Sequence, residues 1–123
     1  MFIFYAFNCG DVEGRVQHIL EKIDGVTEIY RSTQSLAGRL KQSLHDIIVV
    51  VLVINDEKEL ERILDIEDLL AGIPIVIVLN SADSQLISRC HRLHPKLVDA
   101  NKEATATEAV LKALYRKHME EMR

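Results

Sequence analysis

One apolar run constrains the fold of this chain more than any other feature. Ile47 to Ile54 holds eight consecutive residues that are all isoleucine, valine or leucine, and Asn55 ends the run. A strand with one face in water alternates apolar and polar residues, so a continuous run indicates a strand that is covered on both faces. The run is too short to span a bilayer. It therefore predicts the central strand of a parallel sheet that lies between two layers of helices.

Apolar segments and segments of helical periodicity alternate on both sides of this run. The apolar segments predict further strands at 1–7, 26–30, 75–79 and 97–98. Residues at helical spacing predict helices at 12–23, from Ser32 or Thr33 through Leu44, at 57–70, at 86–93, and from Thr105 or Thr107 to the end. Such alternation is typical of βαβ units with right-handed crossovers. We predict one α/β domain over 1–123, a flavodoxin-like three-layer sandwich with strand order 2-1-3-4-5.

Composition narrows the classes of partner and compartment. The chain has 15 Lys and Arg against 19 Asp and Glu, a formal net charge of −4, which disfavours nucleic acid as a partner. The only cysteines, Cys9 and Cys90, are too few for a disulfide framework and suit a reducing compartment. Met1 is followed directly by apolar residues with no basic segment, so no signal peptide is expected. We therefore expect a cytoplasmic protein that has no membrane or nucleic-acid partner.

The predicted topology indicates where a ligand would bind. In open α/β sheets, ligands lie outside the carboxyl ends of the strands, near the point where the strand order reverses. The segments expected there are 8–14, Asn55-Asp56, 80–83 and 100–102.

Two of these segments carry residues that resemble a known family. Ser81-Ala82 follows the fourth predicted strand, and Lys102 follows the fifth. With the alternation over the whole chain, this pattern resembles the receiver domain of two-component response regulators. The resemblance implies an acidic pair after strand one that holds Mg²⁺ and an Asp after strand three that accepts a phosphoryl group. A Ser or Thr and a Lys would then contact the phosphoryl oxygens.

The chain departs from this pattern at the acids. Asn8-Cys9 stands where the acidic pair is expected, and Asp11 lies later in the loop. The acceptor position falls near Val51, inside the apolar run, and Asp56 lies about five residues beyond it. The pocket equivalents are therefore Asn8, Asp11, Asp56, Ser81 and Lys102. We predict a pseudo-receiver that is not phosphorylated on Asp, with no catalytic residue, metal or cofactor. Asp56 is expected to act as a helix N-cap or first-turn acid.

Three other hypotheses remain open for these loops. Cys9, five residues and Arg15 resemble the phosphate loop of low-molecular-weight tyrosine phosphatases, in which a thiolate attacks phosphorus and the Arg clamps the phosphate. Cys9 also resembles the phosphorylated Cys of sugar-phosphotransferase IIB subunits, although the loop here is acidic. The third hypothesis is an active receiver with Asp56 as the acceptor. Separately, Cys90, His91 and His94 have types that zinc accepts, but core packing explains Cys90.

Charge is unevenly distributed along the second half of the chain. Residues 56–68 hold seven acids, and 89–96 hold three basic residues and two histidines without an acid. These segments predict solvated helix faces, or complementary patches for a protein partner or a homodimer. The receiver resemblance implies an interaction surface near the last two helices and the fifth strand. Its expected residues are Arg89, Arg92, Lys96, Lys112 and Arg116.

Overall fold

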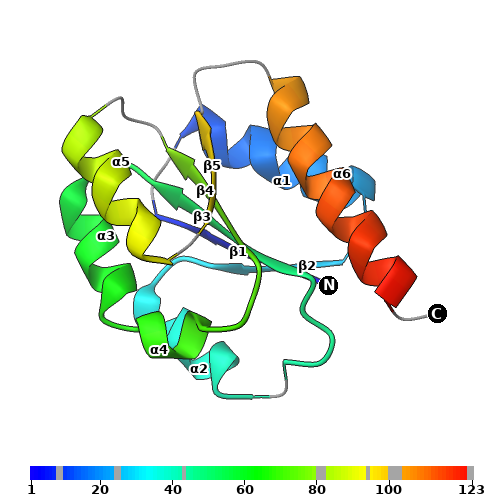
Figure 1. Cartoon of the computed structure of the whole chain (residues 1–123), viewed down its shortest axis with the longest axis horizontal. Helices are drawn as coiled ribbons and strands as arrows, with labels where there is room; N and C mark the ends of the chain where they lie inside the picture. Colours follow the sequence, from blue (N-terminus) through cyan, green and yellow to red (C-terminus); the bar gives the residue numbers. More distant parts are fainter. Residues whose placement is uncertain are drawn as a thin grey trace.

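The computed structural model describes residues 1–7, 10–23, 26–42, 44–79, 83–93, 95–99 and 104–121. Five parallel strands form one sheet in the order β2-β1-β3-β4-β5, which confirms the predicted topology. The strands are β1 (Phe2–Ala6), β2 (Thr27–Tyr30), β3 (Val49–Ile54), β4 (Ile75–Leu79) and β5 (Lys96–Asp99). Helices cover both faces of the sheet (Figure 1).

Strand β3 is the central strand that the apolar run predicted. All six of its residues are buried, and it pairs with β1 on one side and with β4 on the other. Neighbouring residues of a strand point to opposite faces, so a strand between two helical layers needs apolar residues at every position. The run Val49–Ile54 therefore contributes to both cores at once.

The helices are divided between the two faces of the sheet. Helices α1 (Asp11–Ile23) and α6 (Ala104–Glu121) pack on the face of Phe2, Phe4 and Ala6. The opposite face, with Ile3 and Tyr5, is covered by four helices. These are α2 (Thr33–Leu40), α3 (Glu57–Leu64), α4 (Glu67–Leu70) and α5 (Ser84–Cys90). The chain thus has three layers. Helix α4 lies on one side of the sheet and helix α6 on the other (Figure 1).

Some predicted helix limits are wrong. The single helix predicted for 57–70 is two helices, because the chain turns at Asp65 and Ile66 and the Ile66 N–H bonds the Ile63 carbonyl at 3.0 Å. This turn redirects α4 so that Leu70, 1% exposed, reaches the core. The helix predicted for 86–93 ends at Cys90 and continues as a 3₁₀ turn, His91–Leu93. Leu44 was expected on the second helix but lies beyond α2 and is exposed.

Turn residues act as expected at two helix ends. Ser32 caps α2, its hydroxyl accepting the Ser35 N–H at 3.1 Å. Gly72 follows α4 with a φ of 81°, a conformation that residues with a Cβ avoid, so the chain can reverse there into β4. None of the described helices is both long and apolar enough to cross a bilayer.

Candidate functional site

The carboxyl ends of the strands meet at one edge of the sheet. The register pairs Ala6 with Val53, Ile54 with Leu79, and Leu79 with Asp99. Residues that follow these positions therefore lie near the edge where α/β proteins bind ligands. Asn55 and Asp56 follow β3 there, and Asp11 opens α1 after the end of β1.

Asp56 is the N-cap of α3. Its backbone is extended, and its Oδ1 accepts the Glu59 N–H at 2.9 Å. An N-cap carboxylate satisfies an N–H that has no partner within the helix, and its charge complements the helix dipole. The expectation that Asp56 is a capping residue is therefore confirmed. Helix α3 begins at Glu57, directly after this cap.

Glu59 is a buried acid that the sequence reasoning missed. Glu59 is 6% exposed, and its Oε2 accepts the N–H of Asn55 at 2.8 Å. Burial raises the pKa of the Glu59 carboxyl above its usual value, and the bond from the Asn55 N–H opposes this rise. In a capping box, the N-cap residue is followed three residues later by Glu or Gln. Asp56 and Glu59 have this spacing, so the sequence did carry a signal that Glu59 bonds a backbone N–H near the helix start.

The start of α1 holds the other candidate residues that the structure describes. Gly10 has a φ of 60°, and the helix begins at Asp11, which is exposed. Arg15 is therefore inside the helix and exposed to solvent. Glu13, on the same helix, forms an ion pair with Arg31 after β2. The candidates Asn8, Cys9, Ser81 and Lys102 lie outside the described residues.

The described acids at this edge can be compared with the needs of a receiver-type Mg²⁺ site. Such a site needs several carboxylate oxygens that converge on one point. Asp56 bonds its own helix, and Glu59 bonds the Asn55 N–H. The described residues contain no group of three or more His, Cys, Asp or Glu side chains that could hold a metal ion.

The Cys90 thiol is part of the core. Cys90 is fully buried on the face of α2 to α5, and burial raises its pKa to about 11. A thiol with so high a pKa is a poor nucleophile and a poor metal ligand at neutral pH. His91 is exposed, and His94 lies outside the described residues.

The acidic and basic segments of the second half pair with each other. The Arg89 Nη1 lies 3.6 Å from a Glu61 oxygen and 3.9 Å from a Glu57 oxygen. Arg92 donates two hydrogen bonds to Glu67, at 2.7 and 3.0 Å. Part of the charge that was expected to face a partner is thus neutralised within the chain, between α3 and α5 and between α4 and the 3₁₀ turn.

The remaining cations of the predicted surface face solvent. Lys96 at the start of β5 and Arg116 on α6 are exposed. Lys112 is half exposed and pairs with Glu108 one turn earlier, at 2.9 Å. The role of these five cations in binding a partner stays a prediction.

Solved structures with the same arrangement identify the fold. No family model matches the chain, and no curated protein matches it. A pilus assembly-related protein from Burkholderia pseudomallei superimposes with a TM-score of 0.66 at 17% identity, over 93% of this chain and 88% of that one. The Mn²⁺-bound form of the response regulator Rcp1 superimposes with a TM-score of 0.58 at 17% identity, over 92% and 90%. The chain has the receiver fold.

The receiver fold fixes which positions correspond, but not the chemistry at each position. Fold alone does not determine function, because function resides in particular side chains. At the end of β3 the described side chains are Asn55 and the capping acid Asp56.

Proposed function

We propose that this chain is a non-catalytic receiver-like regulatory module that acts by binding another protein and is not phosphorylated on Asp. The observation that carries the proposal is the hydrogen bond that the Asp56 carboxylate accepts. Its carboxylate, the first acid after β3, accepts the Glu59 N–H at 2.9 Å and caps α3. A phosphoryl acceptor needs a carboxylate that faces a bound metal ion and the incoming phosphorus.

The positions around Asp56 support the same proposal. Strand β1 ends in Ala6, and the first carboxylate after it is Asp11, which is exposed at the start of α1. Glu59 is turned toward a backbone N–H. One structural neighbour is a response regulator and the other is related to pilus assembly, two settings that fit a module working by contact with other proteins. The proposed setting is the cytoplasm.

The test of the first claim is phosphorylation by acetyl phosphate in the presence of Mg²⁺, followed by intact-mass measurement. We expect the mass of the protein to stay unchanged. An Asp56→Asn variant serves as the control. A phosphoryl adduct on the wild-type protein that is absent from Asp56→Asn would identify an active receiver and would overturn the proposal.

The structure bears on the phosphatase alternative through the position of Arg15. A phosphate loop needs its residues between Cys and Arg to wrap around the anion with their N–H groups free. Here residues from Asp11 onward are helical, and Arg15 lies inside α1. We expect no hydrolysis of an aryl phosphate by the wild-type protein. Turnover that disappears in Cys9→Ser would instead establish the enzyme.

The choice of variants for a binding test follows from the ion pairs. Charge reversal at Arg89 or Arg92 breaks pairs within the chain, so it would alter the packing of α3, α4 and α5 as well as any contact. Lys96 and Arg116 are exposed, and reversing them changes the surface alone. A partner complex that uses the predicted surface should weaken in Lys96→Glu and Arg116→Glu, with Arg15→Glu, at another exposed cation, as the control.

A further inference from the structure

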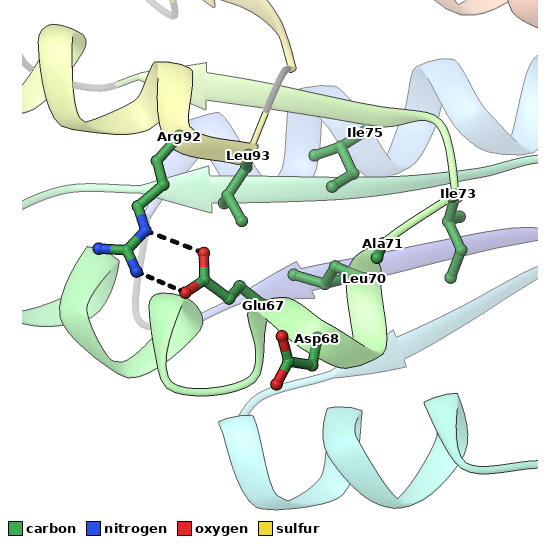
Figure 2. Close-up of a pocket in the computed structure, with 9 residues that line it drawn as sticks. Glu67, Asp68, Leu70, Ala71, Ile73, Ile75, Arg92 and Leu93 are labelled. Carbon is green, nitrogen blue, oxygen red and sulfur yellow. Dashed lines mark hydrogen bonds and ion pairs between the residues drawn. The ribbon is translucent and has the colours of Figure 1, made fainter.

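A groove lies on the face of the molecule formed by α3, α4, α5 and the 3₁₀ turn. Its first hollow has a volume of about 330 Å³ and lies at the amino end of β4 (Figure 2). Its floor consists of Leu70, Ile73, Ile75 and Leu93. The volume is at the small end of the range for ligand pockets, so the hollow suits one bulky apolar side chain.

The rim of this hollow is charged. Figure 2 shows Glu67 turned toward Arg92 and Asp68 turned away from it. Beyond the ion pair lies a second hollow of about 390 Å³, which shares Glu67 and Arg92 with the first. It is otherwise lined by Glu61, Leu64, Asp65 and Arg89. The two hollows form one groove on either side of the Glu67–Arg92 pair.

The charges that line the groove indicate what kind of segment binds there. Its lining holds four carboxylates against two guanidinium groups. The groove is thus acidic overall, with an apolar hollow at one end. Electrostatic complementarity favours a cationic segment that presents one exposed apolar side chain.

Helix α6 of the same chain presents such a segment. Met119 is 45% exposed, and Lys112 and Arg116 precede it by seven and three residues. At 100° per residue these three side chains fall on one face of the helix. Lys112 lies about 10 Å from Met119 along the axis, at 1.5 Å per residue. Met119, Arg116 and Lys112 therefore follow one another along the exposed side of α6, and Lys112 also pairs with Glu108 one turn earlier.

This segment and the groove cannot meet within one molecule. Helix α6 packs on the α1 face of the sheet, whereas α4 and α5 pack on the opposite face (Figure 1). A contact between them requires two copies. We propose that the groove binds the α6 face of a second copy, with Met119 in the apolar hollow, Arg116 beside Asp68, and Lys112 near the carboxylates of the second hollow. The inference rests on the proposed function and names a second copy as the protein partner.

The two surfaces differ, so the contact is head-to-tail. A bound pair of copies leaves one groove and one α6 face available, and association of this kind gives rings or open chains. The average mass should therefore rise with concentration beyond that of a dimer, instead of levelling off at a symmetric dimer.

Sedimentation equilibrium of the whole chain, from about 20 μM to about 1 mM, tests this proposal. We expect a concentration-dependent mass that falls at high salt because screening weakens the charge pairs. Met119→Ala should weaken association about tenfold. Arg116→Glu and Asp68→Lys should each weaken it severalfold, and the double variant with both changes should recover most of the loss. Val26→Ala, a change at another exposed apolar residue on the β2 edge, should leave association unchanged.

The contrary outcomes are distinct. A protein that stays monomeric over the whole range overturns the self-association and leaves the phosphorylation test of the proposed function unaffected. Association that Met119→Ala does not weaken, or that Val26→Ala weakens equally, assigns the contact to another surface and overturns the inference. A double variant that fails to recover, with each variant folded by circular dichroism, overturns the pairing of Arg116 with Asp68.

Discussion

At the residue scale, two acids near the start of α3 bond backbone N–H groups. Asp56 caps α3, and Glu59 is buried with its carboxylate on the Asn55 N–H. Each acid satisfies a backbone N–H near the start of the helix, where four such groups have no partner within the helix. Asp56, the first acid after β3, is thus a helix cap.

The cap at Asp56 makes a measurable contribution to stability. Asp56→Ala removes the oxygen that accepts the Glu59 N–H, and we expect the free energy of unfolding to fall by about 1 kcal/mol. Asp56→Asn keeps a side-chain oxygen and should cost much less. Urea denaturation of the three proteins measures the difference. Equal stability of the alanine variant and the wild type would show that the carboxylate does not cap α3 in solution.

The raised pKa of Glu59 predicts a pH dependence with a definite sign. Between its unfolded and folded pKa values the native state binds more protons, so stability falls as the pH rises through that window. Glu59→Gln keeps an oxygen for the Asn55 N–H and does not titrate. From about pH 4.3, the usual value for Glu, up to neutral pH, the wild type should therefore lose stability relative to Glu59→Gln.

Denaturation of both proteins at a series of pH values gives this difference directly. A difference that stays constant, or that changes in favour of the wild type as the pH rises, would mean that burial does not raise the pKa of Glu59.

At the element scale, the edge strand β2 is attached by a cation on α2. Arg39 is 8% exposed, and its guanidinium donates to Glu28 on β2 at 2.7 Å and to Asp46 before β3 at 3.2 Å. These bonds raise the pKa of Arg39, chiefly through Glu28. An edge strand has only one neighbour in the sheet, so contacts from its helix contribute much of its attachment.

Arg39→Ala should destabilise the protein through this contact. Hydrogen bonds to charged groups contribute about 1.5–3 kcal/mol each when buried, and both acids here are partly exposed, so we expect a total loss of about 2 kcal/mol. Amides of β2 should lose protection from hydrogen exchange first. Arg15→Ala, at an exposed site on α1, is the matched control and should change stability by less than about 0.5 kcal/mol. Equal effects of the two variants would contradict the role of Arg39.

Elements with a strong period could be predicted from the sequence, and contacts between elements could not. The run Ile47–Ile54 identified the central strand because a strand buried on both faces has no polar positions. The break at Asp65 was missed because Leu60, Ile63 and Leu70 keep a helical period across it, while tertiary packing redirects the chain. Arg39 was missed because a charged residue in a helix gives no sequence signal that it is buried.

At the scale of the whole molecule, the fold explains why the charge patches were only partly foreseen. Arg92 and Glu67 are 25 residues apart and meet because α4 and the 3₁₀ turn after α5 lie on the same face of the sheet. In the sequence, the acidic segment 56–68 and the basic segment 89–96 therefore look like two separate surfaces for a partner. The topology 2-1-3-4-5 could be predicted from the alternation of elements. Which charges the fold brings together depends on how the helices pack, and no periodic pattern in the sequence indicates that packing.

The central claim is that the carboxyl edge of the sheet carries no working acidic pocket. The most direct measurement is an amide ¹H–¹⁵N spectrum of the labelled protein with and without Mg²⁺ and beryllofluoride, an acyl-phosphate mimic. We predict that the signals of Asp11, Asp56 and Glu59 stay in place. Saturable shifts that cluster at Asp11, Asp56, Ser81 and Lys102 would show that the edge binds metal and phosphoryl group together, and would contradict the account.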